Sequence, residues 1–137
     1  MVYLIYGSPC SGKTTYIKEH IKQGDIVCDV DNLYSAISLN EPHNSEIYAE
    51  ETASELYDHL LDIIRDRKGH WKNAYVVSLA KTEEQVDRMR ERIKADECVF
   101  IDTPMEECLK RAQERPFYFP WIIEEWFARR SLNECNS

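Results

Sequence analysis

The sequence contains little that would divide the chain or anchor it in a membrane. Four glycines and five prolines are spread over 137 residues, so no tract rich in either residue suggests a linker, and there is no internal repeat. The apolar start lacks the basic segment of a signal peptide, and no run reaches the roughly 20 apolar residues of a membrane span. We therefore expect one domain over residues 1–137 that is soluble, cytoplasmic and without membrane contact.

The sequence also lacks the patterns of a metal scaffold and of a non-specific duplex DNA binder. Its five cysteines form no C-x-x-C pair, so neither a zinc site nor a complete disulfide framework is indicated. Positive charge is scarce, because 17 Lys and Arg face 25 Asp and Glu and leave a net charge of −8. Since non-specific affinity for duplex DNA comes mostly from cations that neutralise phosphates, we expect no such binding.

What the chain does contain is an alternation of apolar runs and helical patterns. Short apolar runs predict strands at 2–6, 26–28, 74–79 and 98–101. Periodic or charged stretches predict helices at 14–23, 33–39, 46–67, 83–94, 106–114 and 121–130. This alternation predicts an α/β fold, with a parallel sheet of about four strands and helices on both faces.

The most specific motif lies between the first predicted strand and the first predicted helix. Gly7-x-x-x-x-Gly12-Lys13-Thr14 is a complete phosphate-binding loop, a pattern expected by chance in a chain of this length with a probability of about one per cent or less. Backbone N–H groups would hold the phosphates, Lys13 would lie along the β and γ phosphates, and the Thr14 hydroxyl would ligate Mg²⁺. The cofactors are therefore predicted to be ATP and Mg²⁺. The predicted nucleotide-binding residues are Gly7, Ser8, Pro9, Cys10, Ser11, Gly12, Lys13, Thr14 and Thr15.

Two large classes of nucleoside-triphosphate protein lack their second motif here. A motor ATPase of the AAA type needs an apolar strand that ends in Asp-Glu, but AYVVSLA has Ser78 there and Asp102 is followed by Thr103. A small GTPase needs an Asn-Lys-x-Asp motif to read its base, and the sequence has none. The remaining class is the small phosphotransferases.

One segment carries a resemblance to a known family. FIDTPMEECLKRAQERP is similar to the corresponding part of small P-loop kinases, above all the 5′-hydroxyl polynucleotide kinases and their uncharacterised phage relatives, which are often labelled AAA-domain ATPases. The resemblance extends to GSPCSGKTTYIKEH and DIVCDVDNLYSAI. It implies a P-loop NTPase fold with a short C-terminal lid, lid arginines at Arg111 and Arg115, and a catalytic Asp after the second strand.

The acid after the second strand can be Asp31 or Asp29. A carboxylate at the carboxyl end of a strand beside the phosphate loop can orient or deprotonate an acceptor hydroxyl, and we predict this role for Asp31. Asp29 is the alternative. A third possibility is that Asp31 only caps the helix that begins at Asn32 or Leu33.

Arg111 and Arg115 are four residues apart, which places both on one face of a helix. Charge builds on the γ-phosphate oxygens during transfer, so a pair of arginines that closes over them would stabilise the transition state. An ordinary solvated face, with Glu107 paired to Arg111, would have the same spacing.

The aromatic residues near the C-terminal end and His43 each have a structural and a functional interpretation. Aromatic residues follow Pro116, and Ile122, Ile123, Trp126 and Phe127 fall on one side of a helix, which favours core packing over stacking on a nucleobase. His43 lies in a predicted loop, where solvation is favoured over contact with an acceptor.

These patterns predict transfer of the γ-phosphate of Mg·ATP to a hydroxyl acceptor, with Lys13, Asp31, Arg111 and Arg115 as the catalytic residues. The acceptor can be a nucleic-acid 5′ end, a nucleotide or nucleoside, or another small metabolite, in that order of preference. The alternative is a regulatory or assembly protein that binds ATP, hydrolyses it slowly and has no acceptor.

Overall fold

A four-stranded parallel sheet forms the centre of the protein. The computed structural model describes residues 1–40 and 46–136. The strands are β1 (Val2–Tyr6), β2 (Ile26–Cys28), β3 (Ala74–Ser78) and β4 (Glu97–Phe100), in the order β2-β3-β1-β4. Every pair is parallel, and Tyr6 lies beside both Ser78 and Phe100, so the carboxyl ends of β1, β3 and β4 meet at one edge.

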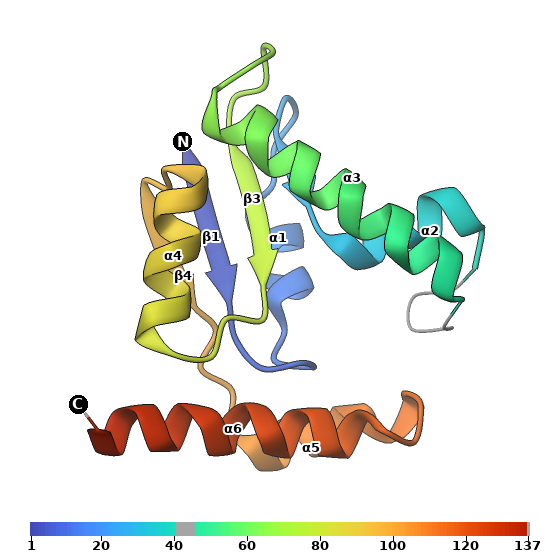
Figure 1. The fold of residues 1–137 in the computed structure, drawn as a ribbon, viewed down its shortest axis with the longest axis vertical. Coiled ribbons are helices and arrows are strands. Elements are labelled where there is room, and N and C mark those ends of the chain that lie inside the picture. Colours follow the sequence, from blue (N-terminus) through green and yellow to red (C-terminus); the bar gives the residue numbers. More distant parts are fainter. Residues whose placement is uncertain (41–45, 137) are drawn as a thin grey trace.

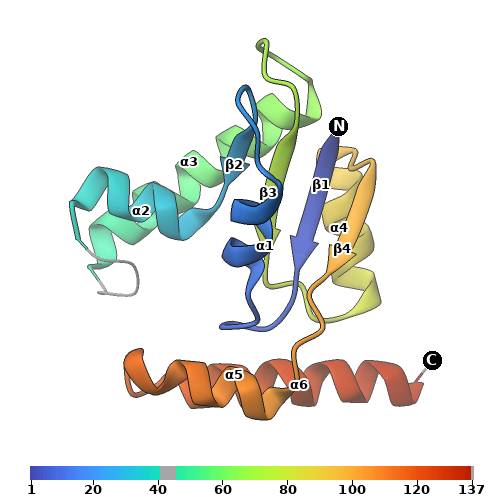
Figure 2. The ribbon, with the colours of Figure 1, turned by 180° about the vertical axis from the view of Figure 1, so that it is seen from behind.

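Helices cover both faces of this sheet, as the sequence predicts (Figures 1 and 2). On one face α3 (Ile47–Arg65) and α4 (Glu83–Ile93) bury apolar residues against alternate strand positions such as Leu4 and Val76. On the other face α1 (Lys13–His20) inserts Ile17 against Ile5 and Tyr75. This alternation along β1 follows from the period of two in a strand, and it gives the sheet an apolar core on each side.

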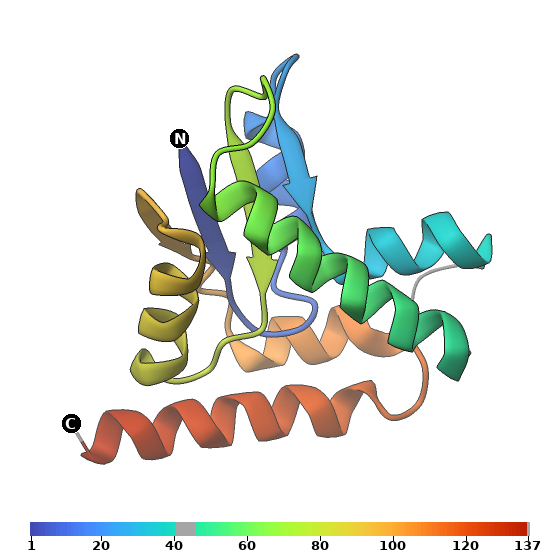
Figure 3. The same cartoon turned by 45° about the horizontal axis from the view of Figure 1, so that its top comes forward.

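A third layer crosses the carboxyl edge of the sheet. After β4 the chain forms α5 (Met105–Arg111), a 3₁₀ turn (Ala112–Glu114) and α6 (Phe119–Asn136). Figure 3 shows α5 and α6 side by side beneath the ends of the strands. The Trp126 indole N–H donates to the Leu79 carbonyl at 3.0 Å, and the Arg130 guanidinium stacks on the Phe100 ring at 4.1 Å. These contacts fix α6 against the loop that follows β3 and against the end of β4.

Helix boundaries differ from the sequence predictions at several places: α1 ends at His20 instead of residue 23, and three other helices differ for a local reason. Helix α2 (Val30–Ser38) begins three residues before the predicted start, because Asp29 caps it. Helix α5 ends at Arg111, because Pro116 disfavours helical backbone at Arg115, which is extended at φ −102° and ψ 168°. Helix α6 is longer than predicted at both ends, with Pro120 accommodated in its first turn.

Within the described part of the chain, no helix combines the length and the apolar character needed to cross a lipid bilayer.

Candidate functional site

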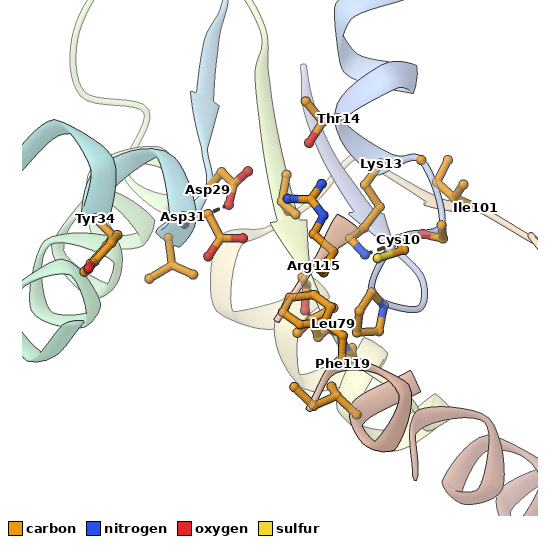
Figure 4. A pocket seen from close by; sticks show the side chains of 18 of the residues that line it. Cys10, Lys13, Thr14, Asp29, Asp31, Tyr34, Leu79, Ile101, Arg115 and Phe119 are labelled. Atoms are coloured by element: carbon orange, nitrogen blue, oxygen red, sulfur yellow. Dashed lines mark hydrogen bonds between the residues drawn. The ribbon is translucent and has the colours of Figure 1, made fainter. Parts of the chain in front are cut away.

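A cavity of about 1180 Å³ lies at the carboxyl edge of the sheet. Its walls come from the phosphate loop, the starts of α1 and α2, the first half of α3, the end of β3, one side of α4 and the segment from the end of α5 to the start of α6. The polar residues predicted from the sequence are brought together here (Figure 4). They are Cys10, Lys13, Thr14, Thr15, Asp29, Asp31, Arg111 and Arg115. Such an edge is the usual ligand-binding position in open parallel sheets.

The two motif glycines are required for different reasons. A Cβ on Gly7 would lie 2.9 Å from the Ile101 carbonyl oxygen, so only glycine allows this close passage. Gly12 has φ 103° and occupies the N-cap of α1, where no side chain accepts from the helix. The first N–H groups of α1 therefore face the cavity edge without a side-chain acceptor, which is the arrangement that binds phosphate.

Cys10 is the unusual residue of the loop. It has φ 64°, a left-handed conformation that favours glycine, and its side chain is half-buried. Its carbonyl oxygen accepts from Arg111 Nη1 at 3.2 Å. The left-handed turn thus directs a backbone carbonyl toward the α5 arginine.

Lys13 is 8% exposed, and its ammonium is hydrogen-bonded to the backbone of the phosphate loop. Nζ donates to the Gly7 carbonyl at 3.0 Å and to the Ser8 carbonyl at 2.7 Å. Burial lowers the pKa of Lys13 from 10.5 to about 8, although the negative charge of Asp29 opposes this shift. A phosphate group beside the ammonium would offset the cost of its burial.

The two acids after β2 have separate positions. Asp29 is 8% exposed and its Oδ1 accepts the Asp31 N–H at 3.0 Å, so Asp29 is the N-cap of α2. The hypothesis that Asp31 only caps the helix is therefore wrong, because Asp31 lies in the first turn. Figure 4 shows the Asp31 side chain between α2 and the phosphate loop, on the side of the cavity opposite Lys13.

The two arginines reach the cavity from different backbone segments. Arg111 ends α5, where it pairs with Glu107 at 3.3 Å as the alternative interpretation expects, and it also donates to the Cys10 carbonyl of the phosphate loop. Arg115 lies beyond the 3₁₀ turn in extended backbone. The expectation that one helical face carries both arginines is therefore wrong, yet both line the cavity.

The residues present can accommodate Mg²⁺ together with phosphates. Among the described residues no group of three His, Cys, Asp or Glu could hold a metal by itself. Thr14 lies in the first turn of α1 and lines the same cavity as Asp29 and Asp31. Mg²⁺ usually takes one or two protein ligands and completes its shell with water and substrate phosphates, so this donor set fits it.

One contact that supports the phosphate loop could not be predicted from the sequence, because the two residues are far apart along the chain. Thr103 Oγ1 donates to the Ser11 carbonyl at 2.6 Å, which ties the segment after β4 to the phosphate loop. The only signal was the place of Thr103 two residues after a predicted strand end. The preference for core packing in the tail is confirmed at Ile123 and Trp126, which are buried. His43 lies outside the described residues.

Comparisons with known proteins agree with the fold. The family model described as an AAA domain matches residues 2–119. Two solved structures, of the "Pnkp1/Rnl/Hen1 RNA repair complex" and the "Pnkp1/Rnl/Hen1 complex", contain chains that superpose with TM-scores of 0.72 and 0.57, each at 18% identity. The matches cover 99% and 86% of this chain but 45% and 43% of those chains, so the chain spans less than half their length. No curated protein matches the sequence.

Proposed function

Because the chain belongs to the AAA domain family and has the P-loop kinase-like fold, we propose that it is an ATP-dependent phosphotransferase. It would move the γ-phosphate of Mg·ATP to a hydroxyl on a nucleic-acid 5′ end, a nucleotide or nucleoside, or another small metabolite. The observation that carries the proposal is that three cations and the two carboxylates after β2 line one cavity, in which Lys13 lies opposite Asp29 and Asp31 (Figure 4).

The cationic side of the cavity would bind the triphosphate. The N–H groups at the start of α1 and the Lys13 ammonium would hold the β and γ phosphates. Arg111 already donates to the Cys10 carbonyl of the loop, and Arg115 lines the same cavity. Their guanidinium groups would stabilise the charge that builds on the equatorial γ-phosphate oxygens in the transition state. Thr14 would ligate Mg²⁺, which supplies further charge neutralisation on the phosphates when bound.

The acidic side would hold the acceptor. Asp31 would accept a hydrogen bond from the acceptor hydroxyl and thereby direct its oxygen toward the γ-phosphorus. As the new P–O bond forms, the bond to the bridging oxygen breaks, ADP leaves, and the hydroxyl proton passes to the Asp31 carboxylate. Asp29 would act as a positioning residue, since its cap fixes the backbone of Asp31.

The RNA repair complexes among the solved relatives support a nucleic-acid end as one acceptor to be tested. The sharpest test of the proposal is incubation with Mg²⁺ and ATP labelled on the γ-phosphate, together with a panel of hydroxyl acceptors. We expect label in an acceptor, and Lys13→Ala as the control should give none. Release of labelled inorganic phosphate alone, with every acceptor unlabelled, would contradict the proposal and favour a slow ATPase with a regulatory or assembly role.

A further inference from the structure

We infer that the acceptor is a small uncharged hydroxyl compound and not a phosphate-bearing one such as a nucleic-acid end or a nucleotide. The inference rests on the proposed function and narrows it to a class of acceptor. It follows from the positions of the charged side chains and of the helix N-termini around the cavity.

None of the lysines and arginines among the described residues that line the cavity comes from α2, α3 or β3. These cations are Lys13 from the loop and Arg111 and Arg115 from the segment after β4. The opposite wall is built by α2, α3 and the end of β3, and it includes Asp29, Asp31, Tyr34, Glu50, Ser54 and Tyr57. The sequence has no Lys or Arg between Lys22 and Arg65, so α2 and the part of α3 that lines the cavity offer no such cation to a second phosphate.

The helix N-termini give a second, independent observation. A phosphate could in principle bind at the start of α2 or α3. The carboxylate of Asp29 already accepts from the start of α2, and Glu46 accepts from the N–H groups of Tyr48 and Ala49 at the start of α3, at 3.2 and 2.8 Å. By contrast, α1 has neither a side-chain cap nor an acid in its first turn. Of these three helix N-termini, only that of α1 is without a carboxylate, and the two beside the acceptor wall are already occupied by carboxylates.

The remaining surface of the wall suits an uncharged compound. Tyr34 and Ala53 are buried, with 5% and 0% of their surface exposed. The Tyr57 hydroxyl donates a hydrogen bond to the Val77 carbonyl at 2.8 Å. Apart from the three acids, the side chains of this wall are therefore apolar or carry a hydroxyl group, as in sites for small polar molecules. Typical ligand pockets measure about 300 to 1,000 Å³, so the cavity, at about 1180 Å³, is large enough for a triphosphate and a small acceptor together.

Matched acceptors test the inference with the full chain and Mg·ATP labelled on the γ-phosphate. Nucleosides and simple sugars would each be compared with a counterpart that carries a phosphate away from the reacting hydroxyl, and with a 5′-hydroxyl oligonucleotide. For the pair of acceptors that reacts fastest, we expect kcat/KM for the uncharged acceptor to exceed that for its phosphate-bearing counterpart by about tenfold or more. An equal or higher kcat/KM on the phosphate-bearing acceptors would overturn the inference but leave the phosphotransferase proposal intact. Labelling of no acceptor would contradict both.

A pair of variants at Ser54, on the acceptor wall, tests the physical cause. Ser54→Arg adds a cation to the wall, and Ser54→Gln adds a neutral side chain of comparable reach. We expect Ser54→Arg to shift the ratio of the two kcat/KM values about tenfold toward the phosphate-bearing acceptor, whereas Ser54→Gln should leave the ratio unchanged. An unchanged ratio in a Ser54→Arg protein that folds and binds ATP would overturn the claim that the charge of this wall selects the acceptor.

Discussion

At the scale of single residues, Lys13 connects the stability of the protein to its ligand. Its pKa is about 8 in the folded chain because burial disfavours the ammonium, against 10.5 for an ordinary lysine. Between these two values the unfolded state binds more protons, so this group makes the free energy of unfolding rise as the pH increases from about 8 to 10.5. Below pH 8 the lysine is protonated in both states, and its contribution no longer changes with pH.

Bound phosphate should therefore raise the pKa of Lys13, and ATP binding near pH 8 should take up protons. Calorimetric titration with Mg·ATP in buffers of different ionisation enthalpy measures this uptake. We expect a fraction of a proton per ATP in the parental chain and none in Lys13→Arg, because an arginine remains protonated. A heat that is independent of the buffer in the parental chain would contradict the assignment of Lys13 to the phosphates.

Cys10 gives a second prediction at this scale, because its left-handed backbone disfavours any side chain with a Cβ. Cys10→Gly and Cys10→Ala both remove the thiol, but only glycine removes the backbone strain. We expect urea denaturation to find the glycine variant more stable than the alanine variant by about 1 kcal/mol. The reverse order would show that the loop does not hold this conformation.

At the scale of elements, the segment after β4 provides the two arginines for which we propose a role in phosphate transfer. Arg115→Ala and Arg115→Lys should each lower kcat by about tenfold or more, because lysine lacks the planar fork that contacts two phosphate oxygens. The melting temperature should change little, since Arg115 is exposed. Arg111→Ala should lower kcat similarly. Parental turnover in either alanine variant would assign that arginine to the solvated surface.

Some features of the site can be predicted from the sequence, whereas others depend on the fold. The phosphate loop was predictable, because its glycines are needed for backbone approaches that few other residues permit. The start of α2 was not, because Asp29 and Asp31 are equally good caps in sequence and only the fold decides which carboxylate reaches an N–H. Thr103 could not be found, because its partner is the carbonyl of a residue 92 positions away.

At the scale of the whole molecule, a ligand that binds only the folded state must stabilise it. Mg·ATP at a hundredfold excess over its Kd should raise the free energy of unfolding by about 2.7 kcal/mol, which thermal melting detects as a higher Tm. Lys13→Ala should lose most of this shift. A shift of the same size in that variant would remove the phosphate role from the loop.

The position of Asp31 opposite the phosphate loop is tested most directly by phosphate transfer in Asp31→Asn. Asparagine keeps the shape of the side chain but cannot take the hydroxyl proton, so labelled transfer to the acceptor should fall by about 10² to 10⁴ while the Kd for ATP stays nearly constant. Asp29→Asn is the matched control, since asparagine caps a helix about as well as aspartate and should leave the chain folded. Transfer at the parental rate in Asp31→Asn would contradict the proposed role of Asp31, and loss of transfer in Asp29→Asn alone would assign that role to Asp29.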